Sequence, residues 1–267
     1  MKTDELLIAQ IEDKIRQADD WSMMTCGDFL DVHQRKVAMD YAKVGKLPVR
    51  MCFYGGYADA ERCIPVFLPD YMSWDGSSLD TIPEEVEDLL RVIRVTIPKG
   101  GKILTHRDYL GSLLALGLDR EVSGDILVRS GGKEACGPGA DIIVKAEIAD
   151  FIELHYSKAG RTNLDVSVLP IAELCIGEVH IVQKHDTVAS LRLDSIVASA
   201  FALSRAKASD AIRRGIVSVN SMEALKTDME IEAGDKIVLR GKGKVVLAET
   251  GGVTRKDRIR ITFDVYQ

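Results

Sequence analysis

Four cations are concentrated in a short segment near the C-terminus, SRAKASDAIRRGIVSVN at residues 204–220, in a chain that is acidic as a whole. The four are Arg205, Lys207, Arg213 and Arg214. Helical spacing places Arg205, Ser209 and Arg213 in one stripe and Lys207 and Arg214, seven apart, in another. Guanidinium and ammonium groups held at fixed separation can make charge-assisted hydrogen bonds to several phosphates. The segment therefore predicts a nucleic-acid contact, and the alternative is a solvated helix face with ordinary surface cations.

Two short helices must position these cations. The first is expected to begin near Arg192, and its buried side is Leu193, Ile196, Val197 and Ala200. Ser204 can cap the second helix through its hydroxyl. That helix offers the packing face Ala208, Ala211 and Ile212. Small residues on this face would let the helices approach closely, and Gly215 would end the second helix before a strand at 216–220.

The charge distribution supports a polyanionic partner for the C-terminal part. The 267 residues carry 35 Lys/Arg and 41 Asp/Glu, a net charge of −6. Residues 188–267 carry 14 Lys/Arg and 10 Asp/Glu, a net of +4, which leaves −10 for residues 1–187. An acidic body with a basic C-terminal part predicts that the last part binds nucleic acid while the rest has another task.

Composition excludes several classes of function. No apolar run reaches the roughly 20 residues of a membrane span, and the acidic residues in MKTDELLIAQIEDKIRQ favour a helix over a signal peptide. The 5 cysteines are scattered, without C-x-x-C or zinc spacing, so reduced thiols in a cytoplasmic protein are expected, with no metal and no cofactor.

The first part of the chain predicts an N-terminal α/β domain over residues 1–78. Residues 3–18 have helical apolar spacing, and Asp28 is a candidate cap for a second helix that reaches about Lys43. Two apolar runs flank Gly55 and Gly56 and are expected to form strands.

Residues 79–178 predict a ferredoxin-like or RRM-like α/β plait with the order β-α-β-β-α-β. Thr105 is a candidate N-cap, followed by a helix with Gly117 near its end, and residues 146–160 predict a second helix. His106 and Arg107 would lie at a helix N-terminus, where a second RNA contact is one interpretation and a capping turn with solvated side chains is the other. The glycine-rich loop at 130–139 lacks phosphate-loop spacing and is expected to be a flexible connection.

The C-terminal pattern resembles the S4 RNA-binding domain. The resemblance is carried by Arg192-Leu193-Asp194, Ser204-Arg205, Ala208, Ile212, Gly215, Val217, Val219-Asn220 and Gly234-Asp235. It implies an S4 (αL-type) domain over residues 179–267 with a C-terminal β extension, and an α+β protein of three small domains. The expected RNA-binding residues are Arg192, Ser204, Arg205, Lys207, Ser209, Arg213, Arg214, Lys242, Lys244, Arg255 and Lys256. Asp194 is expected to order the start of the first helix, and Arg258 and Arg260 either extend the RNA surface or pair with neighbouring acids.

Further blocks extend the resemblance over nearly the whole chain. FYGGYADAER, THRDYLGSLLALGLDREVSGDIL and SLRLDSIVASAFALSRAKASDAIRRG, in that order, resemble the YlmH family. The resemblance implies a non-catalytic protein that contacts rRNA of the large ribosomal subunit and peptidyl-tRNA, and that supports quality control in which alanine is added to stalled chains. A further quality-control factor on the stalled subunit is a candidate partner. The protein is expected to be a monomer in the bacterial cytoplasm or, in a plant, the plastid stroma.

Two rival functions are considered. The first is an RNA-binding regulator or assembly factor, related to cell division or photosystem II. The second is an RNA-modifying enzyme: pseudouridine synthases carry their catalytic aspartate in an RLD context, which occurs here at 192–194, but the continuation typical of those enzymes is missing. The sequence also lacks a methyltransferase cofactor loop, so no catalytic residue is predicted. Replacement of Arg205 and Arg213 by alanine is expected to weaken RNA binding with little change in thermal stability.

Overall fold

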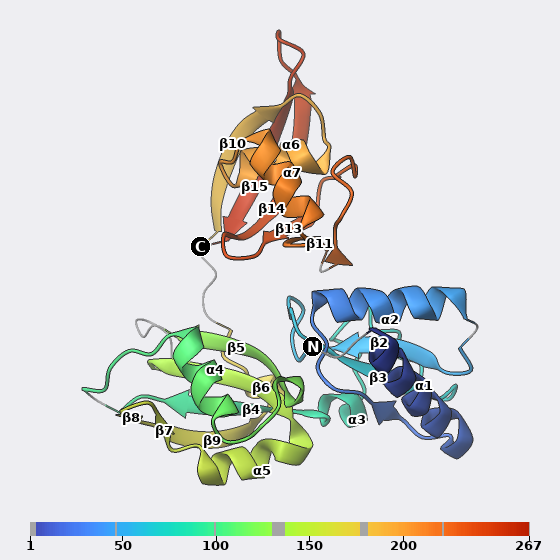
Figure 1. The fold of residues 1–267 in the computed structure, drawn as a ribbon, viewed down its shortest axis with the longest axis vertical. Helices are drawn as coiled ribbons and strands as arrows, with labels where there is room; N and C mark the ends of the chain where they lie inside the picture. The colour runs from blue at the N-terminus through green and yellow to red at the C-terminus, as the bar shows by residue number, and fades with distance from the viewer. Residues whose placement is uncertain are drawn as a thin grey trace. The chain divides into compact units, whose positions relative to one another are not determined.

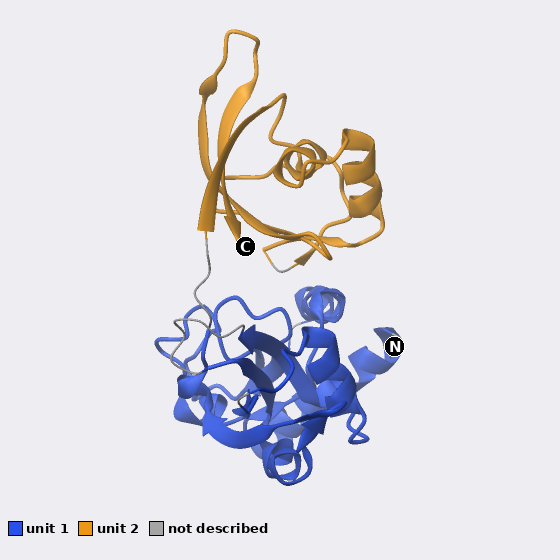
Figure 2. Ribbon diagram, turned by 90° about the vertical axis from the view of Figure 1, so that its left-hand side faces the viewer, with its two compact units in different colours: residues 1–178 blue, residues 179–267 orange. Residues whose placement is uncertain are grey.

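The computed structural model describes residues 4–45, 47–98, 100–129, 137–176, 181–220 and 222–266. Contacts within it divide the chain into two units, residues 1–178 (unit 1) and 179–267 (unit 2), which Figure 2 colours separately. Both units combine helices with antiparallel sheets, so the protein is of mixed α and β composition. The predicted separation of residues 1–78 from 79–178 stays a prediction.

Unit 1 begins with two helices that cover one face of a three-stranded sheet. Helix α1 is Asp4–Trp21 and helix α2 is Val32–Val44. The sheet has the order β1-β3-β2 and consists of β1 (Thr25–Cys26), β2 (Arg50–Tyr54) and β3 (Ile64–Leu68). Leu7, Ile11 and Ile15 recur at helical spacing along α1 and are buried in one cluster with Phe67 of β3.

The cap of α2 differs from the prediction. Asp31, and not Asp28, accepts the backbone N–H of Gln34 at 2.9 Å, and the Gln34 side chain accepts the backbone N–H of Asp31 at 2.9 Å. This reciprocal capping box satisfies two backbone donors at once. Asp28 instead forms an ion pair with Lys145 at 3.4 Å. The prediction was wrong because both aspartates lie just before the helix. Only Asp31 directly precedes Val32, the first residue of α2.

The second part of unit 1 has the order β-α-β-β-α-β (Figure 1). Its elements are β4 (Leu90–Thr96), α4 (His106–Leu114), β5 (Ser123–Arg129), β6 (Gly139–Lys145), α5 (Ala146–His155) and β9 (Asp165–Pro170). Shorter elements around them are α3 (Glu84–Glu87), the 3-10 turns at Arg120–Val122 and Ile171–Glu173, and the pair β7 (Lys158–Ala159) and β8 (Thr162–Asn163). The four long strands are antiparallel in the order β5-β6-β4-β9. The first strand of the motif thus lies between the third and the fourth, as in the split β-α-β sandwich.

Helix α5 is shorter than predicted. It ends at His155, and Lys158 and Ala159 pair with β8 in a tight hairpin. Gly160 adopts a positive φ of 60° at the turn, a conformation that suits glycine. Tyr156 is buried, and its hydroxyl lies 2.7 Å from the Ser112 hydroxyl, which fixes the point where the chain leaves the helix.

Both faces of the four-stranded sheet are covered. On β4, Ile93 and Val95 belong to the core under α4 and α5, which also contains Tyr109 and Ile152. Val92, between them, belongs to the core shared with the three-stranded sheet. The same alternation holds on β6, where Ile142 and Val144 face the helices and Ile143 faces the other sheet. Unit 1 therefore stacks two helices, two sheets and two helices as successive layers.

Polar contacts join these layers at their edges. The Asp125 carboxylate of β5 accepts the Tyr57 hydroxyl at 2.9 Å and the backbone N–H groups of Glu61 and Arg62 at 2.7 and 3.2 Å. Arg62 in turn donates to the Phe29 carbonyl at 3.0 Å. Such bonds satisfy the polar groups that the packing of two sheets removes from water.

Unit 2 is an antiparallel sheet with two helices on it, in the order β10-β15-β14-β13-β11-β12. Its elements are β10 (Ile181–Val188), α6 (Leu193–Ala200), α7 (Arg205–Arg213), β11 (Val217–Val219), β12 (Met222–Glu223), β13 (Lys236–Leu239), β14 (Gly243–Val253) and β15 (Ile259–Tyr266). Residues 181–188 form strand β10, which pairs with the whole of β15. A single core joins both helices to Leu247 and Phe263 of the sheet.

Candidate nucleic-acid interface

The helix pair of unit 2 forms as the sequence predicts. Ser204 caps α7 by accepting the backbone N–H of Lys207 at 3.3 Å. Ala208, Ala211 and Ile212 are buried against α6, so the opposite sides of α7 face solvent. Gly215 follows the helix with φ of 67°, and a Cβ there would lie 2.0 Å from Glu223 Oε1. The positive φ favours glycine where the chain turns from α7 to β11, whereas the end of the flexible Glu223 side chain could move.

Two residues of the predicted pattern, Asn220 and Asp235, meet just after the end of β11. Asn220 donates from its side-chain amide to Asp235 Oδ1 at 2.7 Å and accepts the backbone N–H of Lys236 at 2.9 Å. Asn220 has a positive φ of 50°, which asparagine tolerates better than most residues. The pair fixes β11 beside β13, and β13 leads to the cations described next.

One buried carboxylate organises the first stripe of cations. Asp194 is 5% exposed and accepts two forked guanidinium groups, Arg205 at 3.2 Å to each oxygen and Arg192 at 3.4 and 3.3 Å. Burial raises the pKa of Asp194, but the hydrogen bonds from Arg205 and Arg192 outweigh that effect and lower the pKa below its ordinary value. The side chains of Arg192 and Arg205 remain 43% and 54% exposed, so both guanidinium groups stay accessible to a phosphate.

Arg213 completes this stripe and differs from the two arginines at Asp194. It is exposed, and among the residues that the structure describes no hydrogen bond or ion pair engages its guanidinium group. Ser209, between Arg205 and Arg213, is half-buried. Arg213 is therefore the member of the stripe whose charge is fully available.

A groove of about 490 Å³ runs along the other side of α7. Its walls carry four cations, Lys207, Arg214, Arg240 and Lys242, and its acidic group is Asp210. Arg214 lies 3.6 Å from Asp210 with both side chains 67% exposed, so solvent weakens this pair. The floor is apolar, with Leu203, Ile216 and Leu239. Several cations at fixed separation around an apolar floor suit the phosphates and sugars of a folded RNA.

Arg240 was missed by the sequence reasoning. It follows β13 directly, and its backbone N–H donates to the Ile216 carbonyl at 2.9 Å, which holds it beside the end of α7. The signal that could have found it is the alternation of Arg240, Lys242 and Lys244 in RGKGK. Long-range pairing between β13 and β11 then decides that Arg240 and Lys242 line the groove.

The remaining tail cations are not gathered at the groove. Lys244 Nζ lies 3.8 Å from the centre of the Tyr266 ring. Arg255 and Lys256 lie in the turn between β14 and β15, at the opposite end of an 11-residue strand from Lys242. At about 3.3 Å per residue this separation is on the order of 30 Å, and Figure 1 shows the hairpin tip far from α7. Arg258 donates to the hydroxyl and carbonyl of Thr187, and its charge helps to lower the pKa of the neighbouring Asp186.

The second RNA contact predicted at His106 and Arg107 is less well supported, because the helix N-terminus there is not open to an anion. Thr105 caps α4 as expected, but Asp108 returns to the cap and accepts the Thr105 backbone N–H at 2.8 Å and its hydroxyl at 2.7 Å. A carboxylate of the protein itself therefore already occupies this helix N-terminus. His106 and Arg107 are both exposed, and Arg107 lines a groove with His155 of α5 and Lys158 of β7, whereas His106 does not.

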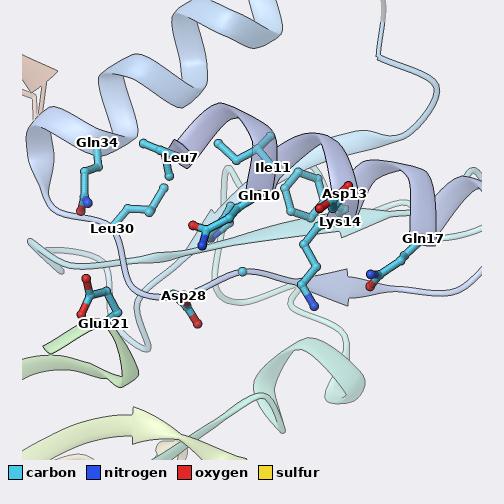
Figure 3. Close-up of a pocket in the computed structure, with 13 residues that line it drawn as sticks. Leu7, Gln10, Ile11, Asp13, Lys14, Gln17, Asp28, Leu30, Gln34 and Glu121 are labelled. Atoms are coloured by element: carbon cyan, nitrogen blue, oxygen red, sulfur yellow. The ribbon is translucent and has the colours of Figure 1, made fainter. Parts of the chain in front are cut away.

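A further pocket, in the N-terminal part of unit 1, offers little catalytic chemistry. A pocket of about 230 Å³ beside α1 is drawn in Figure 3, with Gln34 and Glu121 at one end and Gln17 at the other. No hydroxyl, thiol or imidazole lines it among the described residues. Of its lining residues, Gln34 accepts a hydrogen bond in the cap of α2, and Asp28 forms an ion pair with Lys145.

Cys26, Cys52, Cys63 and Cys175 form no disulfide with one another. The residues that the structure describes hold no group of three or more His, Cys, Asp or Glu side chains suited to a metal. None of the described helices has the length and apolar character that a bilayer crossing demands. Residues 130–136 of the predicted loop, with Cys136, lie outside the described residues, as does His180.

The chain is similar to a known protein along most of its length. Residues 83–173 match a family described as “Putative RNA-binding domain in YlmH”. The chain is 31% identical over 241 residues to the ribosome-associated protein quality control protein P2 of Bacillus subtilis (strain 168), a match that covers 90% of this chain and 87% of the relative. A solved structure of the cell division protein ylmH from Streptococcus pneumoniae is similar at 21% identity and a TM-score of 0.48, over 65% of this chain and 94% of that one.

Proposed function

The chain belongs to the YlmH family, and from this premise we propose that it binds the large ribosomal subunit when that subunit carries an obstructed peptidyl-tRNA. In this proposal unit 2 is an S4 domain that contacts rRNA and tRNA. The whole protein acts in ribosome-associated quality control, the process for which the Bacillus subtilis relative is named, and supports alanine tailing of the stalled chain. It would work in the cytoplasm or in the stroma of a plastid.

The single observation that carries the proposal is the cationic groove beside α7, flanked by the exposed arginines of the first stripe. Lys207, Arg214, Arg240 and Lys242 line one side of the helix, and Arg213 stands on another. Rigid cations on two sides of a short helix can contact two phosphate paths at once. Folded RNA presents two neighbouring phosphate backbones, whereas an acidic peptide presents a single row of carboxylates.

The proposed role is non-catalytic. Asp194 is the residue that an RLD-type catalytic aspartate would occupy, and it is buried beneath two arginines that use both carboxylate oxygens. Both oxygens of this aspartate already accept hydrogen bonds from arginines. A role in positioning those arginines therefore fits Asp194 better than attack on a nucleobase.

Sedimentation tests the proposal. A lysate in which translation has been stalled is separated on a sucrose gradient, and the protein is followed by immunoblot. We expect it with free large subunits that carry peptidyl-tRNA, and expect the amount to fall when the peptidyl-tRNA is released. Recovery in light, ribosome-free fractions alone would contradict the ribosomal role, and recovery there with a bound messenger RNA would favour a regulator of transcripts.

A further inference from the structure

The plait of unit 1 cannot use its sheet as an RNA platform. In many proteins with this motif, bases stack on the open face of the four-stranded sheet. Here that face is buried: Val92 and Ile143 are 0% exposed and lie in one core with Ile64 and Val66 of the three-stranded sheet. Any contact between this part of the chain and RNA must use another surface.

The helix side of the plait has a groove of about 570 Å³ between α4 and the β7 hairpin. Arg107 comes from α4, His155 from the end of α5, and Lys158 from β7. Arg107 and Lys158 are exposed, and no described residue pairs with either side chain. Gly111 and Gly160 also line the groove, and a Cβ at either would meet nothing within 4 Å, so the groove is open to a chain of phosphates and sugars.

An aromatic pair on α5 reaches this groove through His155, which lines it. The rings of Phe151 and His155 are stacked with centroids 4.4 Å apart and an interplanar angle of 27°. A hydrogen bond of 2.8 Å between His155 Nδ1 and the Phe151 carbonyl fixes the histidine ring. Phe151 is 42% exposed although it is large and apolar. Exposed aromatic rings beside cations can stack with an unpaired base, because every base has an aromatic face.

The nearby acids are largely engaged by the protein. Asp108, which lines the groove, is held by the Thr105 backbone and hydroxyl. On α5, Glu147 pairs with Lys145 at 2.7 Å and Glu153 accepts the backbone N–H of Val168 at 3.1 Å. Asp150 is exposed, and Asp108 keeps its negative charge because its Thr105 donors are neutral, so these are the two acids that a bound phosphate must avoid.

We propose that this surface binds an unpaired segment of RNA, with phosphates at Arg107 and Lys158 and one base stacked on the Phe151–His155 pair. The inference rests on the proposed RNA-binding function and deepens it, because it names a surface and a kind of RNA for the part of the chain that matches the putative RNA-binding domain. Unit 2 would hold structured RNA, and the helix side of the plait would hold a neighbouring loop. Double-stranded RNA does not fit this surface as well, because its bases are already stacked.

The test uses the full-length protein and two RNA probes, a stem-loop with seven unpaired nucleotides and the same stem as a blunt duplex. The variants are Phe151→Leu, which keeps apolar bulk and removes the ring, and the double variant Arg107→Gln with Lys158→Gln. The matched control is Arg16→Gln with Lys43→Gln, two exposed cations on α1 and α2. Unchanged thermal unfolding verifies that each variant folds.

We expect Phe151→Leu and the Arg107/Lys158 variant each to weaken stem-loop binding by about fivefold to tenfold. Duplex binding should change no more than in the control, and a 4-thiouridine in the loop should cross-link to residues 146–160. Stem-loop binding that equals the control in both variants would overturn this inference and leave the proposed function standing. Failure of the wild-type protein to bind either RNA would overturn both.

Discussion

The guanidinium group of Arg205 holds both oxygens of the Asp194 carboxylate, with Nε–Oδ2 and Nη2–Oδ1 distances of 3.2 Å. Arg192 makes a second, slightly longer fork to the same carboxylate. The carboxylate is buried at the start of α6, so it fixes the position of two arginines that come from different helices. It also neutralises part of their charge, and the free charge of the first stripe is therefore smaller than a count of its arginines suggests.

Arg213→Ala and Arg205→Ala should have different effects. Arg213→Ala removes an unpaired exposed cation, so RNA affinity and its salt dependence should fall while the free energy of unfolding changes by less than about 0.5 kcal/mol. Arg205→Ala removes one of two forks from a buried carboxylate and should cost about 1–3 kcal/mol. Thermal unfolding with filter binding at several salt concentrations measures both. This prediction differs from the sequence-based expectation that both substitutions leave stability nearly unchanged. Equal stability of the two variants would count against the role of Asp194.

Asp194→Asn should destabilise unit 2 in a pH-dependent way. The folded-state pKa of Asp194 lies below its ordinary value of 3.8, so the ionised carboxylate contributes stability above that value and loses it as pH falls through the folded-state pKa. We expect the variant to be less stable by roughly 2 kcal/mol at neutral pH, with a constant difference down to about pH 5. Urea unfolding between pH 7 and pH 3 measures this difference. A difference that already shrinks between pH 7 and pH 6 would show that another group is responsible.

Asp141→Asn should destabilise unit 1 strongly. The Asp141 carboxylate is fully buried and accepts two hydrogen bonds from Arg94 at 3.1 and 2.8 Å, one from Arg129, and the Cys175 backbone N–H at 2.9 Å. Loss of its charge leaves the buried Arg129 uncompensated, with an expected cost of about 3–5 kcal/mol.

The matched control for that experiment is Asp40→Asn, which removes an exposed pair with Lys43 at 3.4 Å. It should change the free energy of unfolding by less than about 1 kcal/mol. Urea unfolding of the three proteins gives the comparison, and similar values for the two variants would contradict the structural role assigned to Asp141.

Local patterns were sufficient to predict the helix pair of unit 2. Ser204, the alanines of α7 and Gly215 act within one or two turns of the chain, so their spacing predicts the helix, its buried side and its end. The same holds for the Thr105 cap of α4. The prediction that Asp28 caps α2 failed because Asp31 satisfies the same local pattern of a cap.

Features that depend on distant parts of the chain were out of reach. Arg240 joins the groove because β13 pairs with β11, and Arg255 and Lys256 leave it because β14 extends for 11 residues. The covering of Ile143 by the three-stranded sheet depends on packing between segments about eighty residues apart. None of these is visible in the spacing of cations or glycines.

The salt dependence of RNA binding tests the central claim most directly. The slope of log K against log salt concentration is measured for the wild-type protein, for Arg240→Gln with Lys242→Gln, and for the Arg16→Gln, Lys43→Gln control, on one structured RNA. Each lost phosphate contact should reduce the slope by about 0.7–0.9, so we predict a reduction of about 1.5 in the groove variant and a slope close to wild type in the control. Equal slopes in all three proteins would show that RNA does not bind at the groove beside α7.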